Sequence, residues 1–129
     1  GRDFEFARKN WKPLFDKYGV DLVLNGHDHT YARGHVPVKN TDNNKSSDFN
    51  TLYVTSVSGP KQYKIGLDQL DDYGSDGYIA NKTAEQTQFF QVITIDNEKL
   101  IYKAYTALGD EYDTAIIKKD FSTGKKSLE

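Results

Sequence analysis

Three runs rich in β-branched and aromatic residues occupy the last third of the chain, and they constrain the fold most strongly. They cover residues 88–95, 100–107 and 111–118. The segments between them are typical of tight turns: Asp96-Asn97-Glu98 and Leu108-Gly109-Asp110. Strand-forming runs joined by such short turns predict a meander of three antiparallel strands.

The first part of the chain is predicted to form a helix followed by a strand. Residues 3–18 have helical apolar periodicity, and the apolar face consists of Phe4, Ala7, Trp11, Leu14, Phe15 and Tyr18. Pro13 predicts a kink or a restart within this helix, and Gly19 predicts its C-terminal stop. The apolar run 20–24 then predicts a strand buried on both faces, in the middle of a sheet.

The middle of the chain is less regular. Pro37 argues that residues 35–39 form an edge strand, because proline cannot donate to a central ladder. Three further segments are expected: a solvated polar loop over 41–50, a strand over 52–57, and a long excursion over 58–82 with one helical turn near 68–72. Helix and antiparallel strands together predict an α+β fold class.

Composition bounds the size of the core and the classes of function. The chain has 129 residues, of which 36% are hydrophobic, so we expect a single domain with a thin core, or a core completed by further polypeptide. The net charge of -2 gives no electrostatic footprint for nucleic acid. Without Cys, disulfides, thiolate zinc sites and Cys nucleophiles are excluded.

The sequence contains no run of apolar residues long enough for a membrane segment and no signal-peptide pattern. It also contains no Met, and the terminal Leu128-Glu129 is consistent with a vector remnant. Both ends are therefore left out of the functional argument.

The candidate chemistry lies in the loop 25–34, where His27 and His29 are separated by one residue. Side chains at the carboxyl end of a strand in an α/β sheet point into a crevice where ligands bind. Gly26 would permit a sharp turn, so that the two imidazoles diverge toward two metal ions about 3.5–4 Å apart. The same spacing also fits surface or structural histidines, and two ligands alone do not complete a catalytic metal site.

Residues 18–33 resemble the last conserved block of the calcineurin-like metallophosphoesterases. They are closest to the purple acid phosphatase-like branch, in which Gly-His-x-His is followed by a Tyr and an Arg. The resemblance implies that His27 binds one ion of a dinuclear centre and that His29 binds the other. It implies two divalent or trivalent metal ions, with iron, zinc and manganese all open. Ala32 stands where plant members usually have Glu.

The family's other motifs are absent from the sequence: the Asp-x-His opening block, Gly-Asp-x-x-Asp/Tyr, Gly-Asn-His-Asp/Glu and a separate upstream metal-binding His. The chain therefore resembles the C-terminal part, residues 1–129, of a larger metallophosphoesterase domain. The implied fold is a four-layer α/β/β/α sandwich. The implied reaction of the full-length enzyme is hydrolysis of a phosphate-ester substrate, with a metal-bound hydroxide as nucleophile. This chain alone, with an incomplete catalytic site, is expected to be inactive.

Other polar residues of the loop have two interpretations each. Tyr31 and Arg33 are candidate substrate-binding residues, because Arg suits bidentate contact with phosphate. They are equally candidates for packing, with Arg33 paired to an acid. Asp28 is expected to be solvated or to orient an imidazole, and not to bind metal itself. His35 is expected to be an exposed residue on a strand.

Two rival functions remain at the level of sequence. One is a non-enzymatic α+β interaction module with an incidental His-x-His pair. The other is an amidohydrolase, in which a His-x-His pair also follows a strand, but that barrel alternates strands with helices and the meander argues against it. Substrate, oligomeric state and compartment stay open, although members of the resembled family are often exported.

Overall fold

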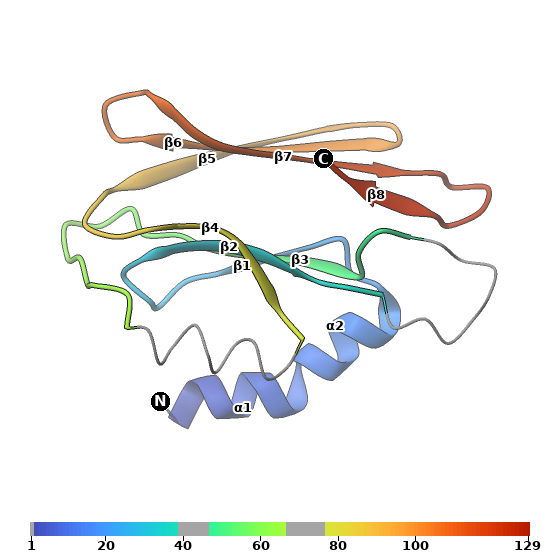
Figure 1. The fold of residues 1–129 in the computed structure, drawn as a ribbon, viewed down its shortest axis with the longest axis horizontal. Helices are drawn as coiled ribbons and strands as arrows, with labels where there is room; N and C mark the ends of the chain where they lie inside the picture. Colours follow the sequence, from blue (N-terminus) through green and yellow to red (C-terminus); the bar gives the residue numbers. More distant parts are fainter. Residues whose placement is uncertain (1, 39–46, 67–76) are drawn as a thin grey trace.

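The computed structural model describes residues 2–38, 47–66 and 77–129, and it has a mixed α+β fold made mostly of strands. Two short helices, α1 (Arg2–Asn10) and α2 (Lys12–Tyr18), come first. The strands form two four-stranded sheets that lie one above the other. The helices lie along the side of the first sheet that faces away from the second (Figure 1).

The first sheet has the strand order β1-β3-β2-β4. Its strands are β1 (Leu22–Asn25), β2 (Tyr31–Val36), β3 (Thr51–Thr55) and β4 (Ile79–Ala84). The β1 strand runs parallel to β3, whereas β2 runs antiparallel to both β3 and β4. The carboxyl ends of β1 and β3 therefore meet at one edge of the sheet, and this edge carries the histidine loop.

The second sheet confirms the predicted meander. Its strands are β5 (Phe89–Asp96), β6 (Lys99–Thr106), β7 (Glu111–Lys119) and β8 (Lys126–Leu128), paired in that order and all antiparallel. The last strand was not predicted. Glu129 exchanges two backbone hydrogen bonds with Ile116, so the terminal residues belong to the fold.

The core lies between the two sheets. Its largest fully buried side chains come from both of them and from the segment before β3: Tyr31, Tyr102, Phe49, Phe89, Leu52, Ile117 and Val54. Burial of Phe49 corrects the expectation of a solvated loop over 41–50 at this position, because an aromatic side chain of this size gains from leaving water. Residues 41–46 lie outside the described residues.

The helical segment divides as its proline predicts. Pro13 sits in the first turn of α2, where its missing N–H costs nothing. Gly19 ends α2 with φ 60° and donates its N–H to the last turn, which confirms the predicted stop. The predicted apolar face is not buried, however: Trp11, Leu14 and Tyr18 are 54%, 50% and 73% exposed. The Phe4 side chain lies outside the described residues.

Two predictions about strand position are wrong. The strand predicted at 20–24 is β1, which pairs only with β3 in the described part of the chain and is half-buried, so it is an edge strand. Of the edge strand predicted at 35–39, residues 35–36 belong to β2, which lies between β3 and β4, and residue 39 lies outside the described residues. Because β2 ends at Val36, Pro37 removes no hydrogen bond from its ladder.

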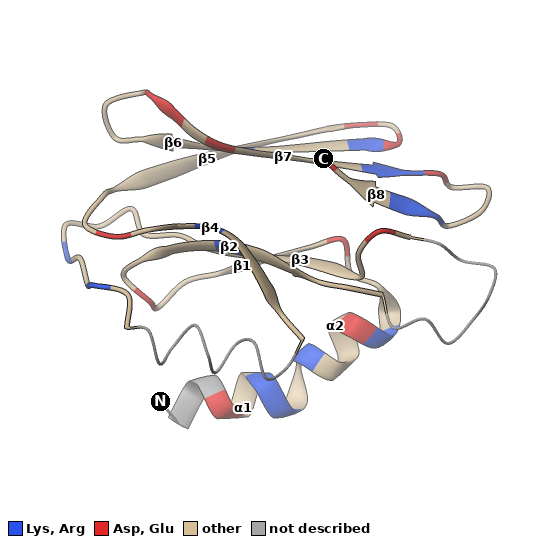
Figure 2. Ribbon diagram, in the orientation of Figure 1, with Lys and Arg blue, Asp and Glu red and all other residues tan. Residues whose placement is uncertain are grey.

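The strand predicted at 52–57 is confirmed as β3, which covers Thr51–Thr55. The β4 strand begins inside the segment 58–82, which was expected to be an irregular excursion, and runs two residues past its end. The helical turn expected near 68–72 lies outside the described residues. Basic and acidic residues are scattered over the helices, strands and loops (Figure 2). Among the described residues, no helix has the length and apolar character that crossing a bilayer requires.

Gly34→Ala is expected to destabilise the first sheet strongly. A Cβ on Gly34 would lie 2.2 Å from Tyr78 Cζ and 2.4 Å from the backbone oxygen of Ile79, and a backbone atom of a paired strand cannot easily retreat. Overpacking of this kind costs about 1–3 kcal/mol, measured as a lower free energy of unfolding in urea. The matched control is Gly26→Ala, where a Cβ meets no described atom within 4 Å. An unchanged Gly34→Ala protein would contradict the tight approach of Tyr78.

Candidate metal centre

The two candidate histidines lie in a short loop between β1 and β2. The loop covers residues 26–30, which is less than the predicted 25–34, because Asn25 extends β1 and Tyr31 already begins β2. The segment 56–66 leaves the carboxyl end of the parallel neighbour β3. Loops from adjacent parallel strands meet where ligands bind in open α/β sheets. The position predicted for the pair, directly after a strand, is confirmed.

His27 is the more exposed of the two. Its side chain is 84% exposed, and its Nδ1 lies 3.4 Å from Oδ1 of Asp28. The backbone of His27 has φ 77°, a left-handed conformation that costs a non-glycine residue ~1–3 kcal/mol. The sharp turn expected at Gly26 is thus taken by His27 itself. Strain of this kind is frequent at functional sites, where the turn aims a side chain outward.

His29 is held by residues of the neighbouring loop. Its Nδ1 lies 2.7 Å from the backbone oxygen of Lys61. The backbone N–H of Tyr63 donates to the His29 oxygen at 3.0 Å. The His29 and Tyr63 rings also pack together with their centroids 4.9 Å apart. His29 is therefore oriented by three contacts, all from a segment more than thirty residues away in sequence.

The donor set suits part of a metal centre. Imidazole nitrogen is a common ligand for zinc, iron and other transition metals, and both rings reach the surface at one sheet edge. Among the described residues, no group of three or more His, Asp or Glu side chains is arranged to hold a metal ion. The two histidines fit a dinuclear centre only if other ligands are supplied from outside the described residues.

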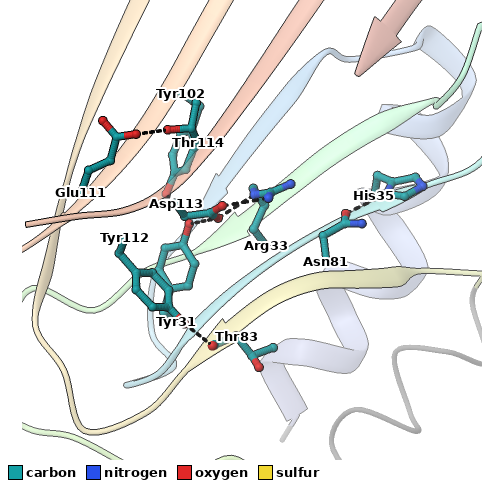
Figure 3. Close-up of polar contacts among 10 residues, drawn as sticks. All are labelled: Tyr31, Arg33, His35, Asn81, Thr83, Tyr102, Glu111, Tyr112, Asp113 and Thr114. Atoms are coloured by element: carbon teal, nitrogen blue, oxygen red, sulfur yellow. Dashed lines mark hydrogen bonds and ion pairs between the residues drawn. The ribbon is translucent and has the colours of Figure 1, made fainter. Parts of the chain in front are cut away.

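Tyr31 and Arg33 occupy the buried interface of the two sheets (Figure 3). Arg33 donates from Nε and Nη2 to the two carboxylate oxygens of Asp113 on β7, at 2.6 and 2.8 Å. The Tyr31 hydroxyl donates to Asp113 at 2.7 Å and lies 3.2 Å from the Tyr102 hydroxyl. This is the packing arrangement that sequence analysis held as the alternative to substrate binding.

Electrostatics in this network favour the charged pair. Burial alone would raise the pKa of Asp113, but the hydrogen bonds from Arg33 and Tyr31 outweigh it and lower that pKa below its usual value. Burial and the Asp113 carboxylate raise the pKa of Tyr31 above its ordinary range. Burial also raises the pKa of Tyr102 to about 12. Arg33 and Asp113 stay charged together, so the network ties β2 to the second sheet.

His35 lies apart from this network, on β2. Its Nδ1 is 2.8 Å from Oδ1 of Asn81, which lies on the adjacent strand β4 (Figure 3). The His35 side chain is only partly exposed, and its strand β2 lies between two others in the sheet. The prediction that His35 is exposed is therefore confirmed only in part.

Sequence reasoning missed the contribution of Lys61 and Tyr63. A backbone carbonyl gives no residue-type signal, so the contact of Lys61 with His29 is invisible in the sequence. The dipeptide Gly59-Pro60 is a turn signal that could have pointed to an ordered loop after β3.

Two uncharacterized proteins of Mycobacterium tuberculosis, from strains CDC 1551 / Oshkosh and ATCC 25618 / H37Rv, each match 28 residues of this chain at 61% identity. The aligned stretch is 22% of this chain and only 5% of each relative. No family model matches the chain, and no solved structure matches it. A match of this length carries no function across, so the chemistry is argued from the site itself.

Proposed function

We propose that this chain is the C-terminal part of a calcineurin-like metallophosphoesterase, of the purple acid phosphatase-like branch, which hydrolyses phosphate esters with two bound metal ions. The observation that carries the proposal is the placement of His27 and His29. Both leave the carboxyl end of β1 on a short loop, one with a strained backbone and one held by the loop that follows β3. Two imidazoles on one loop at the carboxyl end of a strand support a metal site.

The arrangement of layers supports the same proposal. Helices, first sheet and second sheet follow one another (Figure 1), which is compatible with three layers of a four-layer α/β/β/α sandwich. The helices expose apolar side chains at Phe6, Trp11, Leu14 and Tyr18. Exposed apolar surface of this kind is expected where further polypeptide of the same domain packs.

In the proposed enzyme, the residues of this chain bind and orient. His27 and His29 would each offer a neutral imidazole nitrogen, the form in which histidine binds metals. When bound, the two metal ions supply positive charge that ionises a water near neutral pH and stabilises the attacking and leaving oxygens. Arg33 and Tyr31 have no direct part in this proposal, because Asp113 accepts hydrogen bonds from the Tyr31 hydroxyl and from Nε and Nη2 of Arg33. They instead fix the start of β2, two residues beyond His29.

The proposal is tested by comparing this chain with the natural-length protein. After reconstitution with iron, zinc or manganese, the natural-length protein is expected to hydrolyse p-nitrophenyl phosphate. The 129-residue chain is expected to stay at background, since two ligands do not complete the site. Metal-dependent turnover by the chain alone would contradict the need for outside ligands. A natural-length protein that binds no metal and hydrolyses no ester would overturn the proposal and favour the interaction module.

A further inference from the structure

His27 and His29 are prepared very differently for binding a ligand. The His27 side chain is 84% exposed, and its ring lies 3.4 Å from the carboxylate of its neighbour Asp28. His29 instead contacts the segment 59–63, which we call the His29 clamp. The clamp offers the Lys61 oxygen to the ring nitrogen, the Tyr63 N–H to the backbone oxygen, and the Tyr63 ring to the imidazole face.

The contact with Lys61 determines which nitrogen of His29 carries the proton. A backbone carbonyl can only accept a hydrogen bond, so Nδ1 must be the donor at 2.7 Å. In a neutral imidazole the other nitrogen, Nε2, then has a free lone pair. Free histidine in water prefers the opposite tautomer, with the proton on Nε2. The clamp thus imposes the tautomer that presents Nε2 as a ligand.

Tyr63 restricts the rotation of the same ring. Its centroid lies 4.9 Å from that of His29 with a tilt of 43°, and the Lys61 ammonium lies 5.1 Å from the Tyr63 centroid on the ring face. The turn behind these contacts is closed by a hydrogen bond of 2.9 Å from Gln62 Nε2 to the Gly59 oxygen. Pro60 fixes one backbone angle of the turn. The clamp is therefore ordered by its own contacts before any ligand is present.

We propose that the His29 clamp makes His29 a preorganised ligand through Nε2, with Tyr63 as a positioning residue, whereas His27 is oriented only when its ligand binds. Preorganisation avoids the cost of immobilising a side chain, which is about 0.5–1.5 kcal/mol. Contacts to the second ring nitrogen of a metal-binding histidine are known to act in this way. The role of His29 as a metal ligand rests on the proposed function. The Nδ1–H tautomer of His29 and its cause, the contact with Lys61, do not depend on that function.

The tautomer is measured directly by long-range 1H–15N correlation spectra of the 15N-labelled chain. The spectra are recorded at about pH 8.5, some two units above the ordinary imidazole pKa of about 6.5. His29 is expected to show the Nδ1–H form instead of the Nε2–H form of free histidine. His35 is no reference, because the Asn81 amide can present either oxygen or nitrogen to it. A predominant Nε2–H form at His29 would overturn the proposal.

Variants of Tyr63 show whether its ring positions the His29 imidazole or only supports the fold. Tyr63 is 47% exposed and lies outside the core, so the fold should survive its replacement, as the amide spectrum of the second sheet will show. Tyr63→Ala is expected to give a mixture of both tautomers at His29, whereas Tyr63→Phe, which keeps the ring, should retain Nδ1–H. An unchanged tautomer in Tyr63→Ala would refute the role of the ring. If the tautomer behaves as expected but the natural-length protein binds no metal, the proposed function fails and the clamp stands.

Discussion

Replacing either His27 or His29 by Ala in the natural-length protein is expected to reduce hydrolysis of a phosphate ester to background. In the proposed centre each imidazole would bind a different metal ion, so each variant should also lose at least one of the two ions. Loss of one ion would remove part of the charge that stabilises the attacking and leaving oxygens. The measurements are the steady-state rate with p-nitrophenyl phosphate and the metal content by elemental mass spectrometry.

The matched control is His35→Ala, which removes a third histidine from the same stretch of chain. His35 contacts Asn81 on β4 and has no assigned part in the site, so rate and metal content should be unchanged. If both His27→Ala and His29→Ala kept full activity and full metal content, the assignment would be wrong. The interaction module, with an incidental His-x-His pair, would then be the better hypothesis.

The second sheet was predictable because residues close together in the sequence determine both its strands and their pairing. Each of β5, β6 and β7 is a continuous run of strand-forming residues, and the turn between two runs also pairs them. The first sheet was less predictable because its order is set by long-range pairing. Nothing near residues 31–36 indicates that β2 will lie between β3 and β4, and the close approach of Tyr78 to Gly34 involves residues over forty positions apart.

Part of the candidate site could likewise be predicted from local sequence, and part of it depends on long-range contacts. The position of the histidine pair after a strand follows from a local pattern of apolar residues and glycine. The engagement of Arg33 by Asp113 spans 80 residues, and no spacing in the sequence indicates which acid an arginine will meet. The apolar face of residues 3–18 was read correctly as helical, yet most of it is exposed, because periodicity predicts a face and not what covers it.

Asp113→Asn is expected to lower the free energy of unfolding by about 3–5 kcal/mol, the usual cost of breaking a buried ion pair from one side. The Asp113 and Arg33 side chains are only 5% and 11% exposed. An amide in place of the carboxylate would leave the Arg33 charge uncompensated and would replace one of the two oxygens that accept from Tyr31 and Arg33 by an NH2 donor. Urea unfolding followed by circular dichroism measures the loss.

A second ion pair that involves β7 shows whether the loss of stability comes from the burial of the Asp113 pair or from removing any charge. Glu111 pairs with Lys103 at 2.6 Å, but these side chains are 46% and 36% exposed. Glu111→Gln should therefore cost much less stability than Asp113→Asn. The double variant Arg33→Met, Asp113→Leu should recover much of the stability that Asp113→Asn loses, because replacing both charges with apolar groups removes the unpaired one. Equal losses in Asp113→Asn and Glu111→Gln would contradict the buried pair.

The same substitution has a defined dependence on pH. Because the native pKa of Asp113 lies below its usual value, the carboxylate contributes stability above the unfolded pKa of about 3.9. That contribution is lost as the pH falls through the lower native pKa. The difference in unfolding free energy between the wild-type chain and Asp113→Asn should thus be constant near neutrality and shrink below about pH 4. The Asp21 pKa is also lowered, by its hydrogen bonds to Lys119 and Lys126 against the effect of burial, but Asp21 titrates in both proteins and cancels. A difference that stays constant through the acid range would mean that the Asp113 charge adds nothing to folding.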